Sequence, residues 1–320
     1  MLRVLDGRTI RELLPVTELT ARIGAAFTTP DGAPEFARTA VDTGAGDLLL
    51  MPAVHGGTLA VKLLSLFPDA PAHGLPGVQG LVTLFDARTG RPTALIDATA
   101  VTELRTAAVT ALATDRLARP DARVLAVLGT GVQGRGHLEA LAGIRPWDTV
   151  RLYGRDPDRA RRLAGWAADR GWEVAVSDRA GTAVADADVI CTVTSSPVPL
   201  FEAAAVAREG VHISAVGGYG ADRRELPSAL VARARVFVES AAAVLREAGD
   251  LIIPIAEGAM PADTPLVELR DLLSGRHPGR RSDAEVTLFK SVGVPLEDAF
   301  TCDLLYRLAQ ERDAGTAVPL

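Results

Sequence analysis

The stretch from Val124 to Leu138, VLAVLGTGVQGRGHL, decides the fold class. An apolar run up to Leu128 predicts a buried strand, and the residues after the glycines suit a helix. Between them, Gly129, Gly131 and Gly134 follow the spacing G-x-G-x-x-G. In this spacing the first glycine allows a tight turn, the second lets a pyrophosphate approach the backbone, and the third lets the helix pack against the strand. We therefore predict a strand, turn and helix that present free N–H groups to a dinucleotide.

The rest of the second half of the chain continues this pattern. From residue 123 onward, apolar runs alternate with helical stretches, which is typical of a doubly wound parallel sheet in an α/β fold. The expected strands are 124–128, 149–153, 173–176, 189–192, 212–216 and 235–238. The expected helices are 156–170, 179–187, 228–234, 283–292 and 297–312. We predict a Rossmann dinucleotide-binding domain over residues 120–296.

The first part of the chain predicts a second domain, of the α+β kind. Helical spacing runs from Arg8 to Phe27, with Pro15 opening a second helical segment. A long Ala-rich helix is expected from Thr99 to Leu117. Between these helices, turns rich in Gly, Pro and Asp separate β-rich runs of an antiparallel or mixed sheet, at 47–52, 58–66, 78–86 and 93–97. This domain covers residues 1–119, and we expect the last helix, 297–320, to return to it.

Composition excludes several classes of protein. The net charge is −6, and the 34 Lys and Arg residues are spread along the chain among acids, which argues against nucleic-acid and membrane partners. The two cysteines form no C-x-x-C motif, and the N-terminus has no apolar stretch that would make a signal peptide, so we expect a reduced, cytoplasmic protein. The five histidines show no ligand spacing, so no metal site is predicted.

The identity of the dinucleotide can be inferred from the end of the second expected strand. Folds of this type bind the adenosine ribose there, and NAD-preferring sites usually have Asp or Glu at that point. This chain has Gly154, followed by Arg155, whose guanidinium could pair with a 2′-phosphate in a bidentate fork. Alternatively, Arg155 stacks on adenine or is only solvated, and Asp156 serves the ribose. We favour NADP(H) and leave NAD(H) possible.

Other residues at strand ends and in the glycine-rich turn are expected to line the cofactor. Thr194 and Ser195 follow the fourth strand, where small polar residues commonly serve this purpose, although a plain polar turn is nearly as good an interpretation. The whole predicted cofactor set is Thr106, Gly129, Thr130, Gly131, Val132, Gln133, Gly134, Gly154, Arg155, Asp156, Thr192, Thr194, Ser195, Val216, Gly217, Lys290 and Ser291.

The first domain contains isolated cations in apolar surroundings. Lys62 in TLAVKLLSLF shares a strand face with Ala60 and Leu64, so it is either a salt-bridged structural lysine or a group near an anionic substrate with a tuned pKa. Arg105 in VTELRTAAVTALA likewise interrupts the apolar face of a helix and could clamp a carboxylate. Taken alone, each residue favours the structural interpretation.

Taken together, four blocks resemble the ornithine cyclodeaminase and mu-crystallin family. The resemblance runs in order from about Arg38 to the C-terminus, through MPAVHGGTLAVKLLSLFP, GLVTLFDARTGRPTALIDATAVTELRTAA, VLGTGVQGRGHLEAL and LFKSVGVPLEDAF. It implies that the first domain binds the substrate and joins two subunits, through their sheets, into a homodimer. It also implies a substrate-binding set of Arg38, Met51, Lys62, Gln79 and Arg105.

One turn departs from the pattern of this family. Cyclodeaminases and similar alanine dehydrogenases carry a catalytic Asp after the fifth Rossmann strand, whereas this chain reads AVGGYGADRREL and has Tyr219 at that position. A phenol cannot act as a carboxylate base near neutral pH. Asp222 matches an acid of the mu-crystallin-like imine reductases, or it caps the following helix. The predicted catalytic residues are Lys62, Arg105, Tyr219 and Asp222.

The resemblance, with this departure, predicts a reductase of small carboxylate-bearing imines. The expected reaction is NAD(P)H-dependent reduction of a cyclic ketimine 2-carboxylate, 1-pyrroline-2-carboxylate or 1-piperideine-2-carboxylate, to proline or pipecolate. One alternative is an ornithine or lysine cyclodeaminase or an alanine-type dehydrogenase that acts on an amino acid. Another is a cofactor-dependent protein that only binds a small ligand.

Overall fold

The computed structural model describes residues 1–28, 37–218 and 220–319, and the chain folds into two compact units. Unit one comprises residues 1–105 and 293–320, and unit two comprises residues 106–292. The C-terminal helix belongs to the first unit. The unit boundaries fall at 105/106 and 292/293, where the sequence predicted 119/120 and 296/297.

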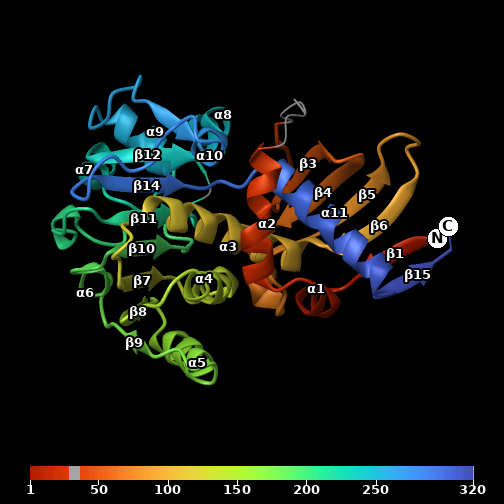
Figure 1. Cartoon of the computed structure of the whole chain (residues 1–320), viewed down its shortest axis with the longest axis horizontal. Helices are drawn as coiled ribbons and strands as arrows, with labels where there is room; N and C mark the ends of the chain where they lie inside the picture. The colour runs from red at the N-terminus through yellow and green to blue at the C-terminus, as the bar shows by residue number, and fades with distance from the viewer. Residues whose placement is uncertain (29–36, 219, 320) are drawn as a thin grey trace. The chain divides into compact units, whose positions relative to one another are not determined.

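Unit one is built on a mixed sheet of seven strands in the order β15-β1-β6-β5-β4-β3-β2 (Figure 1). All neighbours pair antiparallel except β1 and β6, which are parallel. The strands are β1 (Leu2–Leu5), β2 (Thr39–Asp42), β3 (Asp47–His55), β4 (Thr58–Leu66), β5 (Val78–Asp86), β6 (Pro92–Asp97) and β15 (Thr316–Val318). The short strands at the chain ends were not predicted, because three or four residues carry too little alternation.

Helices cover one face of this sheet. Helices α1 (Gly7–Leu13) and α2 (Val16–Thr28) are the two segments expected around Pro15, and α11 (Pro295–Glu311) crosses β3, β4 and β5 (Figure 1). Because side chains alternate along a strand, the covered face of β4 holds Ala60, Lys62 and Leu64, all buried. On the opposite face Leu63 and Leu81 are exposed.

Unit two is an all-parallel sheet of eight strands in the order β13-β12-β14-β11-β10-β7-β8-β9. The strands are β7 (Val124–Leu128), β8 (Thr149–Tyr153), β9 (Val174–Val176), β10 (Val189–Thr192), β11 (His212–Ala215), β12 (Ala234–Val238), β13 (Leu266–Glu268) and β14 (Val286–Lys290). The chain order reverses beside β7, which puts the switch point of the doubly wound sheet between β7 and β10.

Seven further helices lie in unit two, and most are short (Figure 1). They are α4 (Val132–Ala142), α5 (Pro157–Ala168), α6 (Ala180–Val184), α7 (Ser228–Ala232), α8 (Ala241–Glu247), α9 (Gly249–Ala256) and α10 (Leu269–Leu273). No helix within the described residues is long and apolar enough to span a bilayer.

Strand β14 corrects one prediction. Residues 283–292 were expected to be helical, but residues 286–290 form a strand between β11 and β12. All five residues of this strand are buried, because both faces of the sheet are covered. A short run that is apolar on both faces has no alternation, so periodicity cannot tell it from a buried helix segment.

Helix α3 (Ala98–Leu117) explains the unit boundary near its middle. Its later half hydrogen-bonds within unit two: Thr110 Oγ1 lies 3.1 Å from His137 Nε2, and Thr114 Oγ1 lies 3.1 Å from Ser214 Oγ. All four of these side chains are buried. The chain therefore passes from one unit to the other inside a continuous helix, not in the loop that follows it.

Candidate functional site

Lys62 lies on the covered face of unit one, at the centre of β4. Its neighbours in register are Met51 on β3 and Val82 on β5, and both are buried. The Lys62 side chain is only 1% exposed, although a lone buried ammonium is costly. A carboxylate must therefore lie beside it.

The first turn of α11 supplies that carboxylate. Pro295 begins the helix, and its acidic first turn, Glu297 and Asp298, suits the positive end of the helix dipole. Asp298 Oδ2 lies 2.6 Å from Lys62 Nζ, and both side chains are 1% exposed. Arg105 donates from Nη1 to Glu297 Oε2 at 2.7 Å and from Nε to Asp298 Oδ1 at 3.1 Å. One helix turn thus holds two cations from different elements.

Arg38 reaches the same place through the segment before α11. Its Nη2 donates to the carbonyl of Gly293 at 2.9 Å. Gly293 has φ +72°, and a Cβ built on it would lie 2.4 Å from Nη1 of Arg105, so only glycine fits. The structure therefore gathers Arg38, Lys62 and Arg105, three of the predicted substrate-binding residues, with Met51 beside them.

Opposite charges meet within this cluster. Lys62, Arg105 and Arg38 are its cations, and Glu297 and Asp298 are the carboxylates that lie against them. Burial, together with the charges of Arg105 and Arg38, lowers the pKa of Lys62 to about 8, although Asp298 opposes the shift. Burial acts to raise the pKa of Asp298, but Lys62 and Arg105 outweigh it and hold that pKa below its ordinary value. Such a cluster can bind a carboxylate and release a proton near neutral pH.

Gln79 is not brought to this cluster. Its partner in register is Ser65, whereas Lys62 pairs with Val82. Since alternate residues point to opposite faces, this pairing puts Gln79 on the side of the sheet away from Lys62. The resemblance that predicted its role gave only its position in a block, not the face of the strand.

The glycine-rich turn of unit two has the geometry that the spacing predicts. Gly129 has φ +131°, and a Cβ there would lie 2.8 Å from the carbonyl oxygen of Val193. A Cβ on Gly134 would lie 2.1 Å from the carbonyl oxygen of Gly129, so α4 packs directly against the turn. A Cβ on Gly131 would meet nothing within 4 Å. Space is thus open where a pyrophosphate would approach the backbone.

The N-terminus of α4 can receive that phosphate. Gly131 is its N-cap residue and makes no side-chain cap, so the first N–H groups of an eleven-residue helix are left to a ligand. Val132 is exposed at this end, and Gln133 is half-buried behind it. Thr106 on α3 is buried, and its hydroxyl has no hydrogen-bond partner among the described residues.

The end of β8 carries the residues predicted to read the ribose. Gly154 follows the strand, and Arg155 next to it is exposed. Asp156 caps α5: its Oδ1 accepts from the N–H groups of Asp158 at 2.9 Å and Arg159 at 3.2 Å. These bonds hold the pKa of Asp156 below its ordinary value, and the bond from the N–H of Arg159 has the largest effect. The Asp156 carboxylate is therefore already engaged in capping the start of α5.

Glu225 holds together the ends of β10 and β11. Its carboxylate accepts the hydroxyl of Thr192 at 2.8 Å, the hydroxyl of Thr194 at 2.7 Å and the N–H of Gly217 at 2.8 Å. Burial raises the pKa of this glutamate. Of the residues predicted here, Ser195 is exposed and Val216 half-buried. Thr192, Thr194 and Gly217 thus share one buried acceptor, which fixes the loops at the cofactor edge of the sheet.

Lys290 and Ser291 have buried partners of their own. Lys290 Nζ lies 2.9 Å from Asp250 Oδ2 and donates to the carbonyl of Gly218 at 3.1 Å, and the lysine is fully buried. The hydroxyl of Ser291 donates to Glu239. The structure therefore shows both side chains bonded within unit two, and their role at the cofactor stays a prediction.

The turn after β11 contains the remaining predicted catalytic residues. Tyr219 lies outside the described residues. Asp222 is exposed in the following turn and does not cap the next helix, whose N-cap residue is Pro227. The catalytic role of Asp222 stays a prediction.

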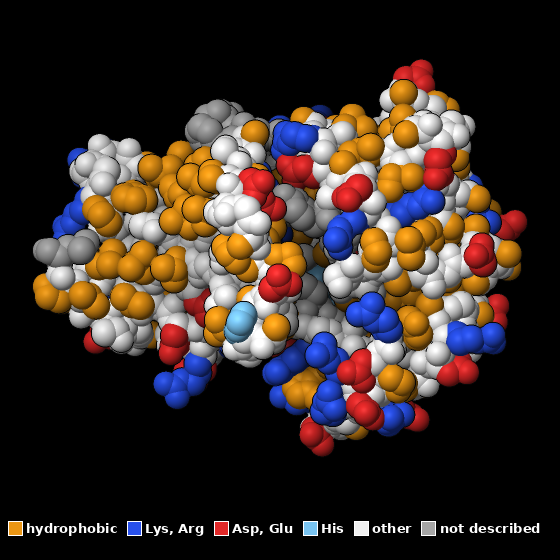
Figure 2. Space-filling model, turned by 180° about the vertical axis from the view of Figure 1, so that it is seen from behind, with side chains coloured by type: hydrophobic (Ala, Val, Ile, Leu, Met, Phe, Trp, Pro, Cys, Tyr) orange, Lys and Arg blue, Asp and Glu red, His pale blue; other side chains and the backbone are white. Residues whose placement is uncertain are grey.

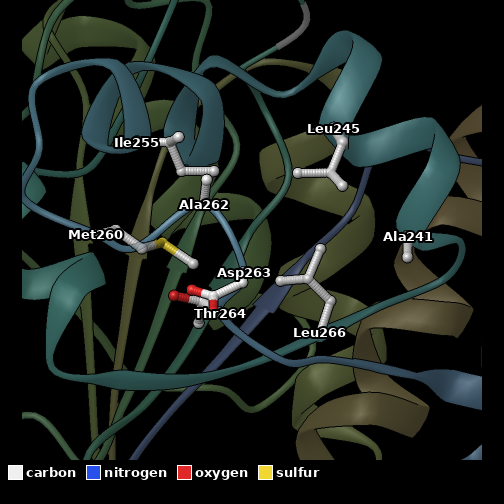
Figure 3. Close-up of a pocket in the computed structure, with 8 residues that line it drawn as sticks. All are labelled: Ala241, Leu245, Ile255, Met260, Ala262, Asp263, Thr264 and Leu266. Atoms are coloured by element: carbon white, nitrogen blue, oxygen red, sulfur yellow. The ribbon is translucent and has the colours of Figure 1, made fainter.

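Unit two also has a pocket of about 220 Å³ (Figure 3). It lies between α8, α9 and the segment before β13, with Asp263 as its one charged residue among the eight that line it. No cation there could hold an acid substrate. Within the described residues, no group of His, Cys, Asp and Glu side chains could hold a metal ion.

Four buried acids are central to these sites and were not predicted: Glu225, Asp250, Glu297 and Asp298. The last two lie in the block LFKSVGVPLEDAF, and adjacent acids at the start of a predicted helix could have drawn attention to them. Nothing in the sequence separates Glu225 or Asp250 from surface acids, because their partners are backbone N–H groups and residues distant in the chain.

The chain is similar to known proteins over most of its length. The chain is 38% identical over 274 residues, 84% of each chain, to a Delta(1)-pyrroline-2-carboxylate reductase of Bacillus cereus. It is similar in structure to the Thermococcus litoralis reductase of that name in complex with NADH and L-proline, with 34% identity, TM-score 0.95, and 99% and 100% of the two chains covered. An archaeal alanine dehydrogenase dimer with bound NAD has 28% identity and TM-score 0.94, with 100% and 99% covered.

Both of these solved structures contain a nicotinamide dinucleotide. The model of the ornithine cyclodeaminase/mu-crystallin family matches residues 3–313. That match spans nearly the whole chain, both units included. The chain belongs to the ornithine cyclodeaminase/mu-crystallin family.

Proposed function

We propose that this protein is an NAD(P)H-dependent imine reductase. Its substrate is a cyclic ketimine 2-carboxylate, 1-pyrroline-2-carboxylate or 1-piperideine-2-carboxylate, and its product is proline or pipecolate. The observation that carries the proposal is the cluster of buried Lys62 and Arg105 with half-buried Arg38, which offers three cations and a proton donor with a pKa of about 8. The similarity to pyrroline-2-carboxylate reductases points to the same substrate class.

Arg38 and Arg105 bind the substrate carboxylate. An arginine fork matches a carboxylate through parallel N–H bonds, which fixes the orientation of the ring as well as its position. Arg105 is held from two sides by Glu297 and Asp298, so little conformational freedom is lost when the substrate binds.

Lys62 supplies the proton. When bound, the reduced nicotinamide supplies a hydride to the imine carbon, and the ring nitrogen must gain one proton as C=N becomes CH–NH. An iminium accepts hydride more readily than a neutral imine, so an ammonium placed beside the nitrogen favours the step. Asp298 keeps Lys62 in place and limits the fall of its pKa. Solvent then restores the proton of Lys62.

We propose that NADP(H) is the preferred dinucleotide. The end of β8 has Gly154 where a carboxylate would repel a 2′-phosphate. Arg155 is exposed beside it, and Asp156 is engaged in capping α5. A phosphate dianion would gain a guanidinium partner here, whereas a free ribose would find no acidic residue at the strand end.

We propose that two copies of the chain pair through unit one. The uncovered face of its sheet is apolar: Figure 2 shows hydrophobic side chains gathered in rows on this unit, and Leu81 is 50% exposed. Contiguous apolar patches on a soluble surface mark interfaces. The test is light scattering after gel filtration: Leu81→Lys should shift a dimer toward the monomer, and a monomeric wild-type protein would refute the proposal.

The activity is tested by following consumption of NADPH, and separately of NADH, with each of the two imines. Rapid loss of NADPH with either imine supports reduction, and the ratio of kcat/KM values identifies the preferred ring size. Faster use of NADH would overturn the NADP(H) preference alone. No consumption of either cofactor, with ammonia released from ornithine, lysine or alanine in the presence of oxidised cofactor, would overturn reduction in favour of deamination.

A further inference from the structure

A neighbouring side chain, and not the backbone conformation, explains why position 154 is glycine. Gly129 has a positive φ, whereas Gly154 does not. Any L-residue could therefore adopt the backbone conformation of Gly154. The obstacle is a neighbouring side chain. A Cβ built on Gly154 would lie 2.4 Å from Thr130 Cγ2 and 2.7 Å from Thr130 Oγ1. Real Cβ atoms do not approach other atoms so closely, so the two residues exclude one another.

Thr130 holds this place because of the sheet. It lies in the glycine-rich turn directly after β7, and Gly154 directly follows β8, the parallel neighbour of β7. The pairing of Leu128 with Tyr153 sets the two turns side by side. Thr130 is β-branched and carries two γ atoms, so rotation about its single side-chain torsion can replace only one of them with hydrogen and leaves the other facing position 154. Even its Cβ would be 3.1 Å from the added atom.

We infer that Thr130 is a specificity-determining residue for the dinucleotide. Its side chain occupies the space that Asp or Glu at position 154 would need, and so the turn cannot carry the carboxylate that binds a free adenosine ribose. With position 154 restricted to glycine, the charged groups offered to the ribose 2′ position are those of the following segment, where Arg155 and Asp156 are exposed and Asp156 is engaged in capping α5. The pair therefore selects a dinucleotide with a 2′-phosphate. This inference rests on the proposed nicotinamide cofactor.

The test uses four variants of the purified full-length protein. Two are the single variants Gly154→Asp and Thr130→Ala, and two are double variants that combine Gly154→Asp with Thr130→Ala or with Thr130→Val. Alanine removes both γ atoms of Thr130, whereas valine keeps the branch and is the matched control. Two readouts are taken for each variant: the melting temperature without cofactor, and the dissociation constants of NADP⁺ and NAD⁺ from calorimetry.

Gly154→Asp alone should lower the melting temperature by about 3 °C or more, because overpacking strains the turn, and should weaken binding of both dinucleotides. Adding Thr130→Ala should recover most of the lost melting temperature and shift the preference toward NAD⁺ by about tenfold or more, as a charge-assisted hydrogen bond to the ribose is gained. Adding Thr130→Val should recover neither property.

Two results would overturn the inference. One is a Gly154→Asp variant that melts like the wild-type protein and gains NAD⁺ affinity; the other is recovery with Thr130→Val equal to that with Thr130→Ala. The melting temperatures need no cofactor, so they test the exclusion between the two residues separately from the proposed function. A wild-type protein that prefers NAD⁺ would refute the NADP(H) assignment instead.

Discussion

The pH dependence of imine reduction tests the role of Lys62. Burial lowers the pKa of this lysine to about 8, so the ammonium is present below that pH and is lost as the pH rises through it. For a required acid with this pKa, the protonated fraction falls from about nine-tenths at pH 7 to about one-hundredth at pH 10. We therefore expect kcat/KM for the imine to fall about ninetyfold over this range, with unit slope at its upper end.

The matched variant is Lys62→Arg. It keeps a cation that can pair with Asp298, but a guanidinium stays protonated throughout the range. We expect lower kcat/KM with no loss between pH 7 and 10, in stopped-flow assays at several cofactor concentrations. If the variant shows the same fall as the wild-type protein, the titrating group is the imine itself or another residue, and the reasoning about Lys62 is wrong.

Two further changes probe the two sites. Asp298→Asn leaves the buried Lys62 without its carboxylate and removes one of the two carboxylates that hold Arg105, and we expect urea denaturation to show a loss of about 3 kcal/mol in the free energy of unfolding. A loss under about 1 kcal/mol would mean that the Lys62–Asp298 pair behaves as an exposed one. In the glycine-rich turn, Gly134→Ala should lower the melting temperature without cofactor, because the added Cβ meets the carbonyl of Gly129. Gly131→Ala should leave the melting temperature unchanged, because its Cβ meets no atom, and should weaken dinucleotide binding about tenfold or more. Equal binding by Gly131→Ala and the wild-type protein would exclude the turn as the pyrophosphate site.

The parts of the fold and site that could be predicted are those with local causes. The strand 124–128 and the glycines after it were predictable because turn, strand and helix follow within fifteen residues. The burial of Lys62 was predictable because strand alternation put it between Ala60 and Leu64. A buried ammonium demands a partner, so the existence of a carboxylate was implied, but not its identity.

What could not be predicted depends on contacts between distant residues. Asp298 is far from Lys62 in the chain, and Glu225 accepts backbone N–H groups that leave no trace in the sequence. The face occupied by Gln79 depends on register, which the block resemblance does not give. Strand β14 was mistaken for a helix because its residues are buried on both sides.

The two lysines of the chain have a practical consequence. Lys62 and Lys290 are the only lysines, and the structure buries both, at 1% and 0% exposure, each against an aspartate. Amine-directed reagents should therefore modify the folded protein at its α-amino group and reach the lysines only when the surrounding structure opens, as it must at Lys62 for the proposed substrate to bind. Labelling at these two positions, read by mass spectrometry, would report opening of unit one and unit two separately, one lysine for each.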